Sequence, residues 1–414
     1  MKNCFVAQSG GPTVAINASL AGAINGVLAS NMYDIIYGSV NGIMGIIDDN
    51  VINLTESIAG SDVLMNRLTC TPAMYLGSCR YKLPSYKDDV SVYETIFQRF
   101  EQYNIGAFFY IGGNDSMDTV LKLSEYAESI GSDVRIIGIP KTIDNDLAMT
   151  DHTPGFGSAA KYVATSVLEV AHDTYIYAVK TVTIIEIMGR DAGWLTAAAA
   201  LARNSYSSAP QLIYLPETDF DKNMFIEDVR RLLETNDSVV VAVSEGIHDA
   251  NGNYISAGES QADTFGHSRL SGAGKALEYM IKDELGVKVR SIEINTLQRC
   301  AAHSASGTDL NEAFAAGNQA VRYAEEGLSG IMVTIERTSA SPYLAGYGYV
   351  KVDEVANKAK SVPREWINAR GNDIMPEMLD YLRPLIIGEF PVHYENGLPV
   401  YMDVSHLTHK NTEN

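Results

Sequence analysis

Two carboxylates that lie close together in the sequence form the strongest candidate for proton-transfer chemistry. The segment Gly138 to Asp146, GIPKTIDND, places Asp144 and Asp146 two residues apart, shortly after Lys141. Beside a cation, one carboxylate of such a pair can accept a proton while the other acts as its electrostatic or metal-side partner. A solvated acidic turn has a similar composition, so proton transfer is a hypothesis that needs further support.

Two glycine-containing turns could bind an anion such as phosphate. Ser9-Gly10-Gly11 follows one apolar run, and Ile111-Gly112-Gly113-Asn114-Asp115-Ser116 ends another. Glycines let the backbone approach a ligand, and free amides at the start of a helix attract negative charge. The second turn also places two polar side chains where open α/β proteins bind ligands. Tight strand-to-helix turns, with Asp115 as a helix N-cap, are the simpler alternative.

Long charged or polar side chains also follow apolar runs elsewhere in the chain. Glu245 comes after VVVAVS, and Arg190 ends the segment Met188-Gly189-Arg190. Further cations are Arg80 and Lys82 in GSCRYK, and Arg290 and Arg299 in RSIEINTLQR. Together these groups would form a cationic cup, although an isolated arginine is more often a solvated surface charge.

The elements that must position these groups follow an alternating pattern. Strands are expected at Cys4–Ala7, Ala107–Ile111, Ile136–Ile139, Thr183–Ile187, Gln211–Leu215, Val239–Val243 and Ile331–Ile335. Apolar residues at helical spacing follow the first of these runs, for example Ile16, Leu20 and Ile24. Apolar strands without alternation are typical of a parallel sheet that is covered on both faces. The sequence therefore predicts a doubly wound α/β architecture.

Length, composition and charge restrict the class of protein. The chain has 414 residues, of which 46% are apolar and 20% charged, so two or three ordinary globular domains are expected. The formal net charge of −20 repels nucleic acid and anionic lipid, so a phosphate-bearing ligand needs a local basic pocket. No stretch approaches the ~18 apolar residues of a membrane-spanning helix. Four separated cysteines without a CxxC pair favour reduced thiols in the cytoplasm.

The motifs SGG, GSCR, GGNDS, PKTIDND, MGRDAGWL, SEG and QR, in this order, resemble those of the phosphofructokinase family across about residues 3 to 350. The resemblance implies that a phosphoryl group is transferred to the C1 hydroxyl of fructose 6-phosphate, with Mg²⁺, in glycolysis. It implies two interleaved doubly wound α/β domains: a phosphoryl-donor domain at 1–155 with about 300–350, and a sugar-phosphate domain at 156–299 with about 351–414. A cytoplasmic homodimer or homotetramer is also expected.

The resemblance also assigns a role to each matching residue. Asp144 matches the general base of the family and Asp146 its companion carboxylate, and the expected catalytic set also contains Lys141, Asp115 and Arg190. The expected contacts to the phosphoryl donor are Gly10 and Arg80. The expected contacts to the sugar phosphate are Thr142, Ile143, Met188, Gly189, Arg190, Glu245, Arg290, Thr296 and Arg299. Asn114 and Asp115 are the expected Mg²⁺ ligands, although most members have an aspartate where Asn114 stands.

Two positions favour pyrophosphate over ATP as the donor. ATP-dependent members look like GGDGS and PGTIDND, whereas this chain reads GGNDS and PKTIDND, as the pyrophosphate-dependent members do. Asp115 thus stands where the α-phosphate of ATP would lie, and its carboxylate would repel that phosphate. Lys141 can instead reach a small anionic donor. Ile43 offers no ring where ATP-using relatives tend to place an aromatic residue that stacks on adenine.

The resemblance is incomplete at the sugar 6-phosphate. Thr181 stands where many relatives supply an arginine across a subunit interface, so Arg290 and Arg299, alone or with Lys180, are expected to bind this phosphate. Two other functions remain open, an ATP-dependent phosphofructokinase and a non-catalytic sugar-phosphate-binding protein, although the intact catalytic set argues against the second. NAD kinases and diacylglycerol kinases share glycine-aspartate turns, but these families do not account for PKTIDND together with MGR.

Overall fold

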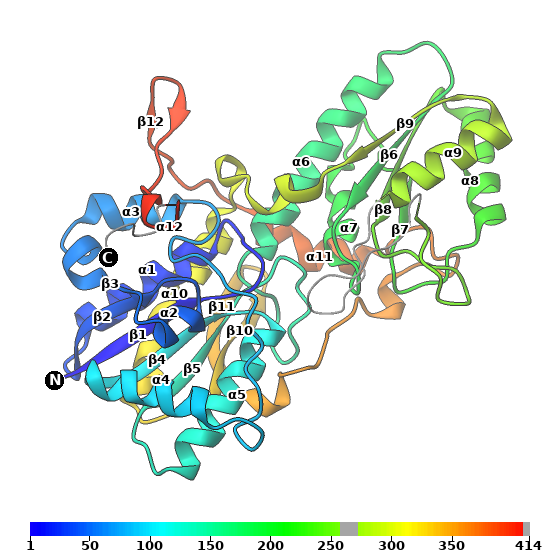
Figure 1. Ribbon diagram of the computed structural model, residues 1–414. Helices are drawn as coiled ribbons and strands as arrows, with labels where there is room; N and C mark the ends of the chain where they lie inside the picture. The colour runs from blue at the N-terminus through cyan, green and yellow to red at the C-terminus, as the bar shows by residue number, and fades with distance from the viewer. Residues whose placement is uncertain (257–271, 409–414) are drawn as a thin grey trace.

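The computed structural model describes residues 1–256 and 272–408. In it the chain forms two mainly parallel sheets that lie side by side, each with helices on both faces (Figure 1). This arrangement confirms the predicted doubly wound α/β fold. Each predicted strand is present, with its ends shifted by at most two residues, except that the last strand, Ile331–Ala340, extends five residues beyond the predicted end at Ile335.

The larger sheet consists of β1 Lys2–Gln8, β2 Tyr33–Ser39, β3 Val51–Asn53, β4 Ile105–Gly112, β5 Arg135–Pro140, β10 Ile331–Ala340 and β11 Tyr343–Lys351. The strand order is β11-β10-β5-β4-β1-β2-β3, and only the two edge strands pair antiparallel with their neighbours. Gln8 is in register with Ile111, and Gly112 with Pro140. The turns after β1, β4 and β5 therefore meet at one edge of this sheet.

The smaller sheet is entirely parallel and consists of β7 Leu212–Tyr214, β8 Ser238–Ser244, β6 Thr181–Ile187 and β9 Lys288–Glu293, in this order. Ile187 is in register with Ser244, which places the turns that carry Met188 and Glu245 next to each other. The sequence pattern does not predict β9. No residue of this edge strand is fully buried, so it lacks the continuous apolar run of a central strand.

Helices cover both sheets. Those on the larger sheet are α1 Ile16–Ala29, α2 Ile43–Ile47, α3 Asp62–Cys70, α4 Ser91–Gln102, α5 Asn114–Ser129 and α10 Gly307–Glu325. Those on the smaller sheet are α6 Phe156–Tyr175, α7 Trp194–Ala198, α8 Lys222–Thr235, α9 Ala273–Leu285 and α11 Pro376–Leu382. Alternate residues of β1 pack on opposite faces, Val6 with α1 and α10 and Phe5 with α4 and α5, which explains its unbroken apolar sequence.

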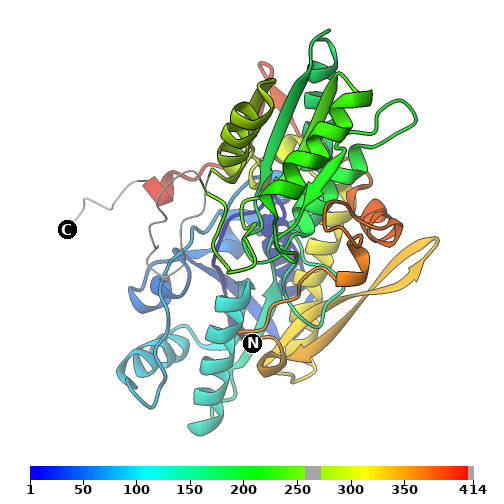
Figure 2. The same ribbon diagram turned by 90° about the vertical axis from the view of Figure 1, so that its right-hand side faces the viewer.

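The chain crosses between the two sheets more than once. After β9 it returns through α10 to the hairpin of β10 and β11, which projects from the larger sheet (orange in Figure 2), and then crosses to α11. The C-terminal helix α12, Ser405–Thr408, returns to the side of the larger sheet. There the His406 imidazole donates to the carbonyl oxygen of Tyr75 over 2.8 Å. The predicted domain boundaries remain a prediction, and residues 409–414 lie outside the described chain.

Within residues 1–256 and 272–408, no helix is both long enough and apolar enough to cross a membrane.

Candidate active site

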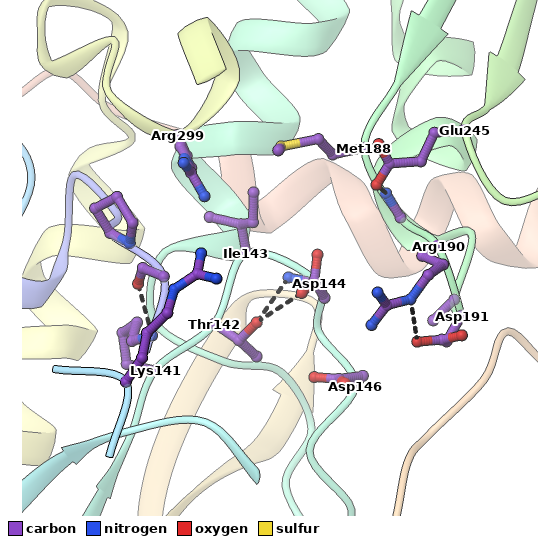
Figure 3. A pocket seen from close by; sticks show the side chains of 15 residues that line it. Lys141, Thr142, Ile143, Asp144, Asp146, Met188, Arg190, Asp191, Glu245 and Arg299 are labelled. Atoms are coloured by element: carbon purple, nitrogen blue, oxygen red, sulfur yellow. Dashed lines mark hydrogen bonds and ion pairs between the residues drawn. The ribbon is translucent and has the colours of Figure 1, made fainter. Parts of the chain in front are cut away.

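A polar cavity of about 340 Å³ lies where the carboxyl ends of the two sheets face each other (Figure 3). It brings together residues that are far apart in the sequence, because the turns after β5, β6 and β8 all open into it. The predicted site residues that line it are Arg80, Lys141, Thr142, Ile143, Asp144, Asp146, Met188, Gly189, Arg190, Glu245 and Arg299. Most of the predicted site therefore forms one continuous surface.

A second cavity, of about 600 Å³, adjoins the first. Gly10 and Asp115 line this second cavity, and Arg80, Arg190 and Arg299 line both. The glycine turn after β1 and the first turn of α5 thus border a space next to the carboxylate pair, and the shared arginines lie where the two spaces join.

Arg290 and Thr296 line neither cavity. Arg290 lies in the middle of β9, where its guanidinium donates to Asp173 Oδ2 over 2.5 Å and to Thr183 Oγ1 over 3.2 Å. Thr296 is exposed in the short 3₁₀ helix Asn295–Arg299. The structure therefore does not bring these two residues to the cavity of their own chain. The reason is that no residue of β9 lines either cavity, whereas Arg299, which follows the strand, lines both.

Ile43 and Lys180 also lie outside the two cavities. Ile43 is completely buried in the core on the α4 face of the larger sheet, so its side chain does not face the donor space. Lys180 is exposed just before β6. Of the residues expected to bind the 6-phosphate, only Arg299 reaches the cavity of its own chain.

The turn after β5 presents the two carboxylates to the cavity. Thr142 Oγ1 donates to Asp144 Oδ2 over 3.3 Å and accepts from the Asp144 backbone N–H over 3.0 Å (Figure 3). Burial raises the pKa of Asp144, against the opposing effect of Lys141. Burial, together with the charge of Asp144, raises the pKa of Asp146 to about 7. The pair can therefore hold and release a proton near neutral pH.

Lys141 lies beneath the glycine turn that follows β1. Its side chain is buried, and its ammonium donates to the carbonyl oxygen of Gly11 over 2.7 Å. Burial lowers the pKa of Lys141 to about 8. Gly10 has a φ of +80°, and a Cβ at this position would lie 3.1 Å from the ammonium nitrogen. Glycine at position 10 thus permits both the backbone conformation of the turn and the approach of Lys141.

The opposite wall of the cavity comes from the smaller sheet. Glu245 accepts a hydrogen bond of 3.3 Å from the backbone N–H of Gly189, and burial raises the pKa of Glu245 to about 7. Gly189 has a φ of +134°, and a Cβ there would lie 2.5 Å from the Ala192 carbonyl oxygen. Arg190 extends toward the space beside Asp144 and is oriented by a 3.0 Å bond to Asp191 (Figure 3). This wall presents a carboxyl group and a cation to a ligand.

Asn114 lies directly behind the carboxylate pair. Its amide is best satisfied when its nitrogen donates to the carbonyl oxygens of Lys358 and Val355, over 3.0 and 3.3 Å. This orientation turns the amide oxygen toward Asp146; the opposite one would form a 3.4 Å hydrogen bond from Nδ2 to Asp146 Oδ2. Two facing oxygens are an arrangement that a cation or a proton can bridge, so the donor set is compatible with Mg²⁺.

Three further residues line the main cavity that were not among the residues expected from the sequence. They are Pro12, Asp191 and Ala192. All three adjoin or fall within the motifs SGG and MGRDAGWL, so proximity to a motif was the signal available in the sequence. Asp191 is the most informative of them because it orients the Arg190 guanidinium.

The chain is similar to known proteins over most of its length. The family model described as phosphofructokinase matches residues 3–324. The chain is 41% identical, over 98% of its own length and 96% of the relative's, to the pyrophosphate--fructose 6-phosphate 1-phosphotransferase of Xanthomonas campestris. It is 28% identical, over 87% of its length and 96% of the relative's, to ATP-dependent 6-phosphofructokinase 2 of Streptomyces coelicolor.

A solved structure supports the same assignment. The crystal structure of the pyrophosphate-dependent phosphofructokinase of Marinobacter aquaeolei matches with a TM-score of 0.87 and 38% identity, over 97% of this chain and 95% of that one. The family match, the full-length similarity and the shared fold lead to one conclusion: the chain belongs to the phosphofructokinase family.

Proposed function

We propose that the protein transfers a phosphoryl group from pyrophosphate to the C1 hydroxyl of fructose 6-phosphate, producing fructose 1,6-bisphosphate and phosphate in a reversible step of glycolysis. The observation that carries the choice of donor is the Lys141 ammonium, which is buried directly beneath the Gly10–Gly11 turn. A cation there compensates the charge of a small donor, and the Asp115 carboxylate on the adjoining cavity repels a nucleotide α-phosphate.

Asp144 serves as the general base in this reaction. The C1 oxygen attacks the phosphorus of the donor, its proton passes to Asp144, and the bond from that phosphorus to the departing phosphate breaks. Lys141, Arg80 and Arg190 line the cavities around this path and stabilise the negative charge of the transferring group. Glu245 is placed to accept hydrogen bonds from sugar hydroxyls on the opposite wall.

Mg²⁺ would neutralise part of the negative charge on the donor phosphates. Asp146, Asn114 and Asp115 would hold it with carboxylate and amide oxygens. The described residues contain no group of three or more His, Cys, Asp or Glu side chains placed to hold a metal ion. This is compatible with Mg²⁺, which commonly uses one or two carboxylates together with substrate phosphates.

The test offers the purified protein fructose 6-phosphate and Mg²⁺ with either pyrophosphate or ATP. Turnover with pyrophosphate and little with ATP is expected. Turnover with ATP alone would support the ATP-dependent alternative. Binding of the sugar phosphate without turnover on either donor would support the non-catalytic one.

We also propose that residues 1–155 with about 300–350 bind the donor and residues 156–299 with about 351–414 bind the sugar. The main cavity supports this division, because Gly11 and Lys141 lie on one wall and Met188 and Glu245 on the other. Helix α12, which includes His406, contacts the loop that carries Tyr75 in the first of these two sets, and residues Ser405–Thr408 do not line the cavity. We assign the protein to the cytoplasm, in agreement with its four free thiols.

We further propose a homodimer or homotetramer in which Arg290 reaches the site of a neighbouring copy. Arg290 lies outside the cavity of its own chain, and Ile176 and Val179 before β6 are 70% and 53% exposed, as at a contact between copies.

Charge-assisted bonds to phosphate contribute about 1.5–3 kcal/mol. Arg290→Ala should therefore raise the KM for fructose 6-phosphate more than ~10-fold.

Complementation tests whether this contact crosses between subunits. Copies with Arg290→Ala and copies with Asp144→Asn should recover activity when they are co-expressed, because a mixed oligomer contains sites with both side chains. An unchanged KM in the Arg290→Ala protein would show that Arg290 does not bind the 6-phosphate.

The pKa values of the site predict a bell-shaped pH profile of kcat/KM for pyrophosphate. Activity should fall below about pH 7, where Asp146 takes up a proton, and above about pH 8, where Lys141 loses its charge. In Lys141→Arg the alkaline fall should disappear, since a guanidinium stays protonated. If that variant keeps the same alkaline fall, Lys141 is not the group that titrates. The measurement holds the free Mg²⁺ concentration constant.

A further inference from the structure

A segment that follows the region matched by the family model lies against the loop of the catalytic carboxylates. The match ends at residue 324, whereas Lys360 lies after β11 and Tyr381 in α11. The backbone N–H of Lys360 donates to the carbonyl oxygen of Asp146 over 2.7 Å, and Ala359 pairs with Leu147. The segment thus adds a short β-like contact directly after the carboxylate pair.

Lys360 is bonded to loops from both sheets. Its ammonium donates to the carbonyl oxygens of Thr150 and Asp151 over 3.0 and 2.8 Å. Its own carbonyl oxygen accepts from the Trp194 indole N–H over 2.9 Å, at the end of the loop that carries Arg190. Through its backbone and its side chain, this residue therefore ties the carboxylate loop to the Arg190 loop across the cleft.

Tyr381 holds the same loop from its other side. Its hydroxyl accepts from Asn145 Nδ2 over 2.8 Å and donates to the Asp151 carbonyl oxygen over 2.7 Å. Asn145, between the two carboxylates, has a φ of +54°, a conformation that a non-glycine residue adopts with some strain. The Tyr381 ring packs against Trp194 and Trp366, with centroids 5.3 and 5.5 Å away. The hydroxyl is thereby fixed where it stabilises the unusual turn.

We infer that Lys360 and Tyr381 are positioning residues for Asp144 and Asp146. The inference rests on the proposed phosphoryl transfer, because it concerns the geometry of that base. Neither side chain lines the cavity, so neither touches the substrate. Their effect passes through the backbone at residues 145–151, where a shift of about 1 Å can reduce a rate as much as 10²-fold.

Two variants that preserve packing test the inference. Tyr381→Phe keeps the ring and removes the hydroxyl; Lys360→Met keeps the aliphatic stem and removes the ammonium. We expect each to lower kcat at least ~10-fold while the KM values for pyrophosphate and fructose 6-phosphate stay within ~2-fold. Tyr349→Phe and Lys351→Met, at exposed positions of β11, are the matched controls and should retain wild-type kcat.

A double-variant cycle separates positioning from a general loss of structure. If Tyr381 acts through Asp144, Tyr381→Phe should lower the residual kcat of the Asp144→Asn protein less than ~2-fold, because the group it positions is already lost. The inference is overturned if the two substitutions reduce kcat independently, so that their effects multiply in the double variant. It is also overturned if the KM values rise as kcat falls, or if the Tyr381→Phe protein has the wild-type kcat.

Should Lys360→Met fail to fold, Tyr381→Phe alone decides, since it removes a single oxygen atom. Failure of the positioning role can be distinguished from failure of the proposed function. A wild-type protein inactive with pyrophosphate would refute the function. An active wild type, with an impaired Asp144→Asn variant and an unimpaired Tyr381→Phe variant, would refute only the positioning role.

Discussion

Replacing Asp144 with asparagine should lower kcat with pyrophosphate about 10²- to 10⁴-fold and change the KM for fructose 6-phosphate little. The amide keeps the shape of the side chain but cannot accept the proton of the C1 hydroxyl. Asp144 is suited to this task because it is partly buried in the cavity, accepts from Thr142 and lies near both Lys141 and Arg190. The measurement is steady-state kinetics with both substrates varied.

The control for this experiment is a carboxylate far from the cavity. Asp283→Asn, at an exposed position of α9, makes the same chemical change and should leave kcat unaltered. Thermal unfolding of both variants verifies that they are folded. Near-normal turnover of the Asp144→Asn protein would mean that another group accepts the proton.

Changing Asp115 and Lys141 together to glycine should lower kcat/KM for pyrophosphate ~10²-fold or more. The double variant recreates the turns of the ATP-dependent members and removes a cation that stabilises the transition state. Lys141 is expected to account for most of the loss because its ammonium is buried beneath the glycine turn. Activity with ATP should rise, because the carboxylate that repels the α-phosphate is gone.

Single variants show which of the two substitutions lowers the activity with pyrophosphate and which raises the activity with ATP. Asp115→Gly alone should permit some use of ATP, while Lys141 still fills the space that a nucleotide needs. Asp115→Asn removes the same charge without adding a flexible glycine to the first turn of α5, so it controls for loss of helix stability. A double variant that keeps its pyrophosphate activity, or a wild type that prefers ATP, would contradict the proposed donor.

The sequence alone was sufficient for the central strands and for the motif residues at their ends. Strands such as β4 and β8 are buried on both faces, so their apolar runs are continuous and easily recognised. A parallel sheet brings the carboxyl ends of its strands to one edge. The position of Gly10, Asp115 and Lys141 directly after their strands in the sequence was therefore enough to place them near one another.

Edge strands and the residues on them could not be predicted in the same way. β9 has no fully buried residue, so its sequence lacks the signal of a central strand. Arg290 was consequently expected at the end of an apolar run, whereas it lies in the middle of β9 and bonds to Asp173. Its place in β9, none of whose residues lines a cavity, and not its residue type, keeps Arg290 outside the cavity.

The amino-acid sequence by itself thus determined which charged groups follow which apolar strand. Only the tertiary structure decided how those groups are buried and held. The pKa values of Asp146 and Lys141 are shifted toward neutrality by desolvation, which depends on segments remote in the sequence. Lys360 and Tyr381 contact the carboxylate loop only because the chain crosses back between the sheets more than 200 residues later. Lys360 is 209 residues from Asp151 in the sequence, and Tyr381 is 236 residues from Asn145. Local spacing carries no information about such contacts, since they form only when both units have folded and packed together.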